Sequence, residues 1–165
     1  MSEPASNRSC IVVGVGEGLG AALARRFADG YKVALLARSA EVIEKTAAEI
    51  NAAGGTALPL RHDATVEAQI AEAYARVVRD PGPVEVLIYN GGRRPMGRLM
   101  DTTPQVCEET WRLHTFGAFL WSRQVVPDMI KPSAIADAFW YLAHQDRSAW
   151  SHELDVRPFT EKFQV

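Results

Sequence analysis

The stretch "IVVGVGEGLGAAL", residues 11–23, decides the fold of this chain, because it sets four glycines between a β-branched run and an alanine-rich one. The β-branched run predicts a buried strand over Cys10–Val15, and the apolar residues at helical spacing after it predict a helix over Leu19–Ala28. Glycines between a strand and a helix permit a tight turn and let backbone N–H groups approach phosphate oxygens. The stretch therefore predicts a nucleotide site at the start of that helix.

Strand and helix patterns continue to alternate as far as residue 90. Further strands are expected at Tyr31–Ala37, Thr56–Leu60 and Val84–Tyr89. Helices are expected from Ser39, as N-cap, to about Ala53 and over Val66–Arg79. Nearly continuous apolar strands joined by helices are typical of a parallel sheet covered on both faces. The sequence thus predicts an α/β fold, a three-layer, doubly wound parallel sheet of Rossmann type, with Pro59 at a sheet edge.

The C-terminal part of the chain predicts a long helix, a second helix and a short strand. They are expected at about Pro104–Met129, Ser133–His144 and His152–Val156. No internal repeat, low-complexity tract or linker divides the chain, and 165 residues fit one domain. Residues 1–165 are therefore expected to form a single dinucleotide-binding domain.

Composition and charge exclude several classes of function. The net charge of −2 offers no basic excess for nucleic acid or an anionic membrane, and no apolar run is long enough to span a bilayer. The polar start "MSEPASNRSC" does not resemble a signal peptide. Neither the two cysteines nor the histidines show metal-ligand spacing. These features predict a soluble, cytoplasmic protein without a metal site.

The glycine spacing allows three interpretations. Gly16-x-Gly18-x-x-Ala21 fits the general dinucleotide fingerprint. Gly14-x-Gly16-x-Gly18 would suit a methyltransferase loop. Gly14-x-x-x-Gly18-x-Gly20 is the pattern of short-chain dehydrogenases/reductases, and residues further along the chain decide among the three.

The ends of the following strands carry the deciding residues. The second strand ends at Arg38, where methyltransferases and NAD-specific enzymes usually place a carboxylate that binds ribose hydroxyls. A guanidinium pairs instead with a 2′-phosphate, and the alternative for Arg38 is a solvated arginine at a strand end. Asp63 after the third strand can accept a hydrogen bond from an adenine amino group or cap the next helix. Asn90 and the glycines after it suit close packing beside a cofactor.

In order and spacing, "VVGVGEGLG", "LLARS", "HDA" and "YNGG" resemble the short-chain dehydrogenase/reductase family over residues 9–130. The resemblance assigns cofactor binding to the glycine loop, the end of the second strand and the end of the fourth strand. It also assigns it to Asp63 and Ala64, which form the adenine pair. These residues are Gly14, Gly16, Glu17, Gly18, Leu19, Gly20, Arg38, Asp63, Ala64, Asn90, Gly91 and Gly92. Tyr89 and Gly91 depart from the family's Asn-Asn-Ala-Gly, and the acidic Glu17 does not favour a 2′-phosphate.

The resemblance implies an oxidoreductase that moves a hydride between NADP(H), rather than NAD(H), and a small carbonyl or alcohol. It also implies a homo-oligomer, either a dimer or a tetramer. The alternative is a non-catalytic, degenerate family member that binds NADP. The choice between them depends on the catalytic residues.

The family's catalytic residues are not found in this sequence. The family's Asn-x-x-Gly-x-Phe reads "HTFGAF" here, so that His114 stands in place of the asparagine. No tyrosine is followed four positions later by lysine, and the catalytic residues are therefore unknown. The flanking pieces match parts of the family that are normally far apart. This predicts a missing segment near Ile130-Lys131, on the order of 60–90 residues at 30 or more per βαβ unit.

Two weaker groups have simpler interpretations. A solvated loop is favoured for Arg93, Arg94 and Arg98 over the mouth of a site for an anionic substrate. The core or a subunit interface is favoured for the tryptophans over a platform for stacking bases. These are Trp111, Trp121, Trp140 and Trp150.

Overall fold

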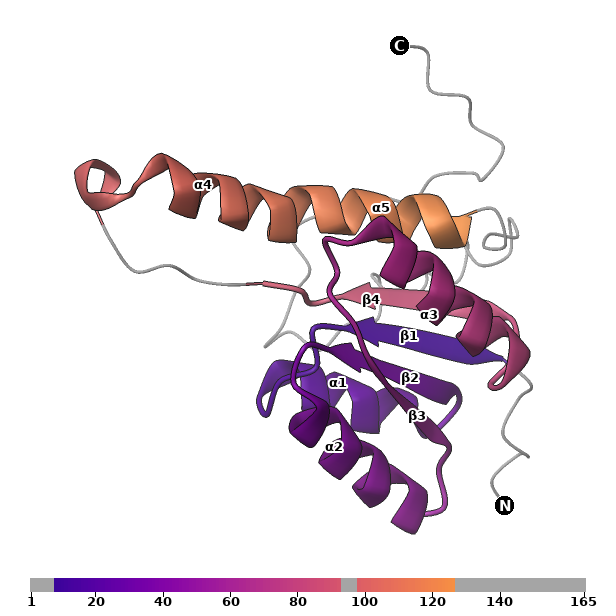
Figure 1. Ribbon diagram of the computed structural model, residues 1–165. Helices are drawn as coiled ribbons and strands as arrows, with labels where there is room; N and C mark the ends of the chain where they lie inside the picture. The colour runs from indigo at the N-terminus through magenta and orange to yellow at the C-terminus, as the bar shows by residue number, and fades with distance from the viewer. Residues whose placement is uncertain (1–7, 93–97, 127–165) are drawn as a thin grey trace, which may run out of the picture.

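The computed structural model describes residues 8–92 and 98–126, which build a parallel four-stranded sheet (Figure 1). The strands are β1 (Ser9–Val13), β2 (Lys32–Ala37), β3 (Ala57–Arg61) and β4 (Val84–Tyr89). Their order is β3-β2-β1-β4, and every pair is parallel. All five residues of β1 are buried because this strand lies between two others. Pro59 lies in the edge strand β3, as the sequence predicts, where its missing N–H interrupts no second ladder.

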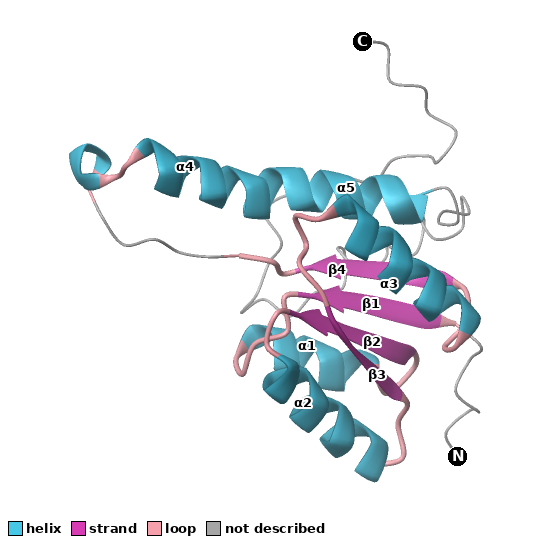
Figure 2. Cartoon of the chain, in the orientation of Figure 1, coloured by secondary structure: helices cyan, strands magenta, loops and turns pink. Residues whose placement is uncertain are grey.

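Helices cover both faces of the sheet, which gives three layers (Figure 2). They are α1 (Leu19–Phe27), α2 (Ala40–Ala52), α3 (Glu67–Arg79), α4 (Pro104–Trp111) and α5 (Gly117–Val125). A π-helical turn, η2 (Arg112–Phe116), joins α4 to α5, and a short 3-10 helix, η1 (Leu99–Asp101), precedes α4. The fold is the doubly wound α/β arrangement that the sequence predicts.

Alternation along the strands sends successive side chains into two separate cores. Cys10 and Val12 pack with α1 and α2 on one face. Ile11 and Val13 pack with α3 and α5 on the other. Burial on both faces favours apolar residues at successive positions, which explains the unbroken apolar run from Cys10 to Val13.

The structure corrects the expected end of the first strand. β1 stops at Val13 and not at Val15, because Gly14 adopts a φ of +85°. The N–H groups of Gly14 and Val15 then both donate to the carbonyl of Leu36, at 2.8 and 3.2 Å. Ser39 does hold the N-cap position of α2, but its side chain makes no capping hydrogen bond.

The long helix predicted at about Pro104–Met129 is confirmed over the described residues, from Pro104 to Val125. Thr103 caps it by accepting a hydrogen bond from the N–H of Val106 at 3.3 Å, and Pro104 fills the first turn. The π-helical turn within this helix was not predicted. The second helix and the terminal strand that the sequence predicts lie outside the described residues, as does the proposed join at Ile130-Lys131.

Neither a membrane-crossing helix nor a disulfide occurs in the described part of the chain. No helix there combines the length and the apolar character that a bilayer requires. Cys10 is buried in β1 and Cys107 is exposed on α4, and both are free thiols. Burial raises the pKa of Cys10 to about 12.

Candidate functional site

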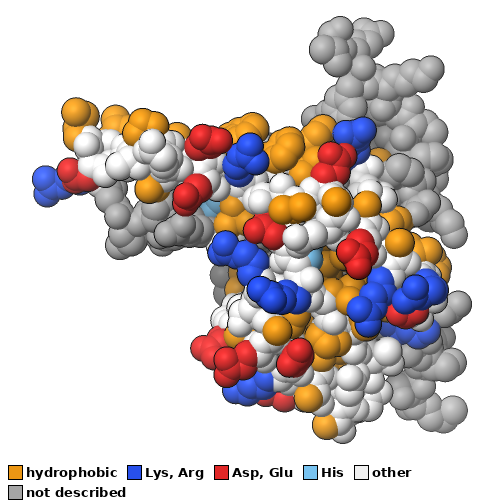
Figure 3. All heavy atoms as spheres, in the orientation of Figure 1, with side chains coloured by type: hydrophobic (Ala, Val, Ile, Leu, Met, Phe, Trp, Pro, Cys, Tyr) orange, Lys and Arg blue, Asp and Glu red, His pale blue; other side chains and the backbone are white. Residues whose placement is uncertain are grey.

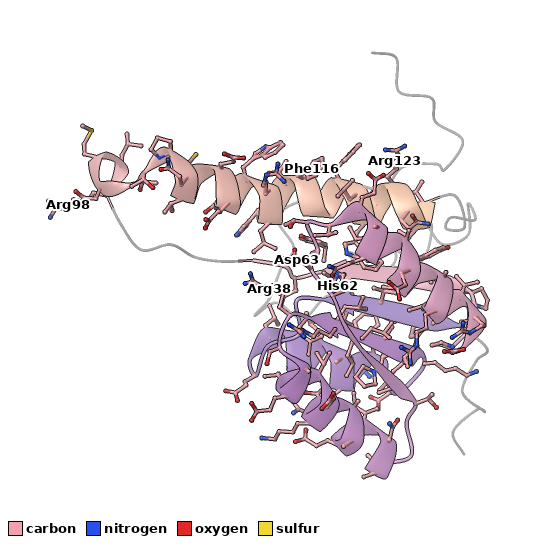
Figure 4. The ribbon with its side chains drawn as sticks, in the orientation of Figure 1. Arg38, His62, Asp63, Arg98, Phe116 and Arg123 are labelled. Atoms are coloured by element: carbon pink, nitrogen blue, oxygen red, sulfur yellow. The ribbon has the colours of Figure 1, made fainter. Side chains whose placement is uncertain are left out.

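The carboxyl ends of the four parallel strands meet at one edge of the sheet, and the predicted site residues follow them. Gly14 follows β1, Arg38 follows β2, and Asp63 lies two residues beyond β3. Asn90 comes directly after β4. Arg38 and Asp63 are close together at this edge, beneath the long α4–α5 helix (Figure 4). The fold thus brings together residues from four separate parts of the sequence.

Two of the loop glycines are required by the fold itself. A Cβ on Gly14 would lie 2.6 Å from the carbonyl carbon of Asn90, and its positive φ also disfavours other residues. A Cβ on Gly20 would lie 2.8 Å from Cα of Val15. Gly14 therefore lets the chain pass the end of β4, and Gly20 lets α1 pack against the end of β1.

The other two loop glycines face open space. A Cβ on Gly16 or Gly18 would meet no protein atom within 4 Å. Glu17 and Leu19 beside them are exposed. Among the described residues, the backbone N–H groups of residues 17–19 find no acceptor, as expected at the start of a helix. The start of α1 thus presents free donors and the positive end of a helix dipole.

Asn90 ties the ends of β1 and β4 together. Its backbone N–H donates to the carbonyl of Val13 at 2.8 Å, and its Nδ2 donates to the carbonyl of Gly14 at 3.0 Å. The side chain is therefore used to hold the glycine loop in place. Gly91 and Gly92 follow it directly in the chain.

Tyr89 and Gly91, the two departures from the pattern Asn-Asn-Ala-Gly at the end of β4, are explained by their contact with each other. The Tyr89 hydroxyl donates to the carbonyl of Leu113, which is freed because the N–H of Gly117 bonds to Arg112 in the π-helical turn. A Cβ on Gly91 would lie 2.8 Å from Cζ of Tyr89. The tyrosine ring therefore occupies the space that an alanine at position 91 would need.

Asp63 forms a tight turn of its own rather than a helix cap. Its Oδ1 accepts from the N–H of Thr65 at 2.9 Å and from the Thr65 hydroxyl at 2.7 Å. Helix α3 begins at Glu67 with Val66 as N-cap, so the capping alternative is wrong. Burial acts to raise the pKa of the Asp63 carboxyl, but the Thr65 hydrogen bonds and the charge of Arg38 outweigh it and lower the pKa.

Arg38 is exposed and makes no side-chain hydrogen bond to any described residue. Its charge acts on Asp63, whose pKa it helps to lower. Basic side chains gather on the surface in this region (Figure 3). Ala64, the partner of Asp63 in the predicted adenine pair, is buried beneath the same edge.

His114 lies at the other end of the edge, in the π-helical turn. A Cβ on Gly92 would lie 3.4 Å from Cε1 of His114, which puts the imidazole beside the end of β4. The His114 side chain is exposed and is not packed in the protein interior.

Other candidates lie away from this edge or outside the description. Arg98 is at the far end of the α4–α5 helix, remote from Arg38 and Asp63 (Figure 4). Arg93 and Arg94 lie outside the described residues, as do Trp140 and Trp150. Trp121 is fully buried in the core, while Trp111 is half exposed on α4.

Sequence reasoning did not single out the pairing of His62 with Trp121. His62 is only 4% exposed, and its Nε2 accepts from the Trp121 indole N–H at 3.1 Å. Its Nδ1 is buried with no partner among the described residues. Burial lowers the pKa of His62 to about 4, against the opposing effect of Asp63. A histidine next to Asp63, for which adenine binding is predicted, was the available signal, but its indole partner is distant in sequence.

We expect His62 to make the protein less stable in mild acid. Below its ordinary pKa of 6.5 the unfolded chain takes up a proton that the folded protein refuses until about pH 4. The free energy of unfolding should therefore fall by up to about 3 kcal/mol as the pH drops through that window. Urea denaturation from pH 7 to 4 measures this. His62→Gln should show a shallower slope, and equal slopes would contradict the prediction.

Comparison with known proteins agrees with this geometry. A family model described as short chain dehydrogenase matches residues 8–135. Versicolorin reductase 1 of Aspergillus parasiticus is 32% identical over 121 residues, which cover 72% of this chain and 46% of that protein. The chain thus spans less than half the length of this relative.

Two solved structures have the same fold as the described residues. A variant of actinorhodin polyketide ketoreductase with NADPH gives a TM-score of 0.71 at 28% identity, covering 74% of this chain and 48% of that one. A metagenomic short-chain oxidoreductase in complex with NADP gives 0.70 at 30% identity, covering 74% and 57%. About half of each of these proteins therefore has a counterpart here.

Proposed function

The chain belongs to the short-chain dehydrogenase family of oxidoreductases, and from this we propose that its strand-end edge binds NADP(H). The observation that carries the proposal is the joint placement of an open glycine loop, Arg38 and Asp63 at one edge of a parallel sheet. In folds of this kind, dinucleotides lie across the carboxyl ends of the strands. Two relatives of known structure hold NADPH or NADP.

The residues of the loop fit a pyrophosphate. The backbone at Gly16 and Gly18 is open, and the N–H groups at the start of α1 have no protein acceptor among the described residues. Phosphate oxygens are the ligands that such donors bind. Gly14 and Gly20 then act indirectly, because they let the loop take its shape.

Adenosine would lie beside β2 and β3. The Asp63 carboxylate keeps Oδ2 available while Oδ1 is held by Thr65, so it can accept from an adenine amino group. The N–H of Asp63 donates to Gln69 at 2.8 Å, which fixes the turn. Arg38 pairs with a 2′-phosphate through charge-assisted hydrogen bonds. Asn90, Gly91 and Gly92 would line the nicotinamide end, with His114 beside them.

We expect Arg38→Ala to weaken NADPH binding about 10- to 150-fold, from a loss of about 1.5–3 kcal/mol. NADH lacks the 2′-phosphate, so its affinity should stay the same. Calorimetric titration with both cofactors measures this. Arg26→Ala is the matched control, because Arg26 is exposed and pairs with Asp29. Equal binding of NADPH and NADH by the unaltered protein would show that Arg38 does not select the phosphate.

Nicotinamide cofactors supply hydride transfer, so reduction of a small carbonyl or oxidation of an alcohol is the proposed reaction class. A second candidate, binding of NADP without turnover, is favoured by one observation. No tyrosine in the sequence has a lysine four positions later, and this pair supplies the proton in the family. We propose that the segment that carries it is absent between Ile130 and Lys131.

A homo-oligomer, either a dimer or a tetramer, is part of the same proposal. Trp111, Phe119 and Val126 of the α4–α5 segment are exposed. Apolar side chains are visible along the outer side of this helix in Figure 3. The rings of Trp111, Phe116 and Phe119 stack in sequence along it. Exposed apolar surface of this kind is typical of a protein interface. A cytoplasmic location stays a prediction from the sequence.

A further inference from the structure

A pocket of about 490 Å³ opens at the carboxyl ends of β2 and β3. Its lining comes from the end of β2, from the turn after β3 and from the first turns of α3. The lining residues are Arg38, Arg61, His62, Asp63 and Gln69. Arg38 and Asp63 are seen on this side of the sheet in Figure 4. Arg61, like His62 and Gln69, is a member of this set to which the sequence assigned no role.

Arg61 is held at the pocket by a bond to a distant part of the chain. It is the last residue of β3, and its Nε donates to the backbone carbonyl of Arg38 at 3.2 Å. Its two terminal amino groups have no partner among the described residues. The bond fixes the base of the guanidinium next to Arg38 and leaves four N–H donors unused.

The absence of an ion pair sets Arg61 apart from most arginines of the protein. Every arginine in residues 8–92 and 98–126 apart from Arg38, Arg61 and Arg98 pairs with a carboxylate. The paired ones are Arg8, Arg25, Arg26, Arg76, Arg79, Arg112 and Arg123. Two of the three unpaired guanidiniums therefore share one pocket. Asp63, the carboxylate in the lining, has one oxygen already bound by Thr65.

We infer that Arg61 is a second cation for the 2′-phosphate of the cofactor and, with Arg38, determines the preference for NADP(H). The inference rests on the proposed function. A phosphomonoester carries about −1.5 to −2 charges near neutral pH, so one guanidinium compensates only part of it. The second guanidinium supplies the remaining charge and unused donors from the neighbouring strand.

The test compares ligands with and without the phosphate. Arg61→Gln removes the charge, and we expect it to weaken NADPH and adenosine 2′,5′-bisphosphate about tenfold or more. NADH and 5′-AMP should change less than about twofold, since they lack the 2′-phosphate. Calorimetry measures all four. Arg26→Gln is the control, and circular dichroism checks that each variant is folded. Inorganic phosphate as competitor separates a dinucleotide site from a general anion site, and displacement by it at equal concentration would overturn the inference.

A double variant separates direct contact from an effect through Arg38. In an Arg38→Ala background, Arg61→Gln should weaken NADPH binding further if Arg61 contacts the phosphate. No further loss would overturn the inference and leave Arg61 with the task of holding the Arg38 backbone. Arg61→Gln could still prefer NADPH over NADH as strongly as the unaltered protein does, while Arg38→Ala has lost this preference. That result would overturn the inference but leave the proposed function standing. If the unaltered protein bound neither cofactor, both would fail.

Discussion

Gly18→Val should abolish binding of NADPH and leave the fold intact. The new side chain starts in open space, where no protein atom lies within 4 Å of a Cβ, so packing is not disturbed. The same space is where phosphate oxygens would meet the N–H groups of the loop. Loss of two such hydrogen bonds, at about 1.5–3 kcal/mol each, corresponds to at least about 100-fold weaker binding.

Gly30→Val is the matched control for this prediction. Gly30 follows α1 at the end of the domain remote from the loop, and a Cβ there also meets nothing within 4 Å. Calorimetry with NADPH and thermal unfolding should give the unaltered values for this variant. A folded Gly18→Val protein that binds NADPH normally would reduce the loop to a structural turn, and the nucleotide proposal would fail.

Gly14→Ala, by contrast, should lower the stability of the fold, because the backbone of Asn90 and Gly91 leaves no space for the new methyl group. The methyl group would press on the end of β4, and the φ of +85° costs an L-residue about 1–2 kcal/mol before any overlap is counted. Of the four glycines in the loop, Gly14 and Gly20 are therefore required by the fold, whereas Gly16 and Gly18 leave the backbone open to a ligand. The sequence alone does not show which glycines have which role. The division depends on which glycines have Asn90 or Val15 against them.

The positions of the strands, and the place of β3 at the side of the sheet, could be predicted because their physical cause is local. Val12 and Val13 face opposite cores, so the positions from Cys10 to Val13 are all apolar, and that run is visible in the sequence. Pro59 lacks the N–H of a central strand and so indicates an edge. Residues after the strand ends then converge by topology alone, which is why Arg38 and Asp63 could be assigned to one site.

The features that could not be predicted depend on contacts between distant residues. The Tyr89 hydroxyl donates to a carbonyl of the π-helical turn, and this hydrogen bond depends on the packing of α5 against β4. Neither the bond nor the turn can therefore be predicted from the local sequence. The same holds for His62, whose burial follows from Trp121. The sequence assigns no role to Arg61, because its bond to the Arg38 backbone joins residues 23 positions apart.

A polypeptide of only these 165 residues should bind NADPH but not reduce a carbonyl. Hydride transfer leaves a developing oxyanion that needs a positioned proton donor, and general acid catalysis is typically worth about 10²–10⁴ in rate. In the family, tyrosine gives the proton and lysine lowers its pKa. None of the four tyrosines here has that lysine. Four positions after Tyr31, Tyr74, Tyr89 and Tyr141 stand Leu35, Val78, Arg93 and Gln145.

Intact mass and turnover must be measured on the same preparation. At 18.1 kDa, NADPH should not be consumed above background with a panel of aldehydes and ketones, while a full-length family reductase serves as the positive control. A mass higher by several kilodaltons would place a further segment within the chain and make carbonyl reduction plausible. Robust turnover at 18.1 kDa would contradict the prediction. His114 would then be the first acid to test, because its imidazole lies beside Gly92, and His114→Ala should remove that turnover if the histidine donates the proton.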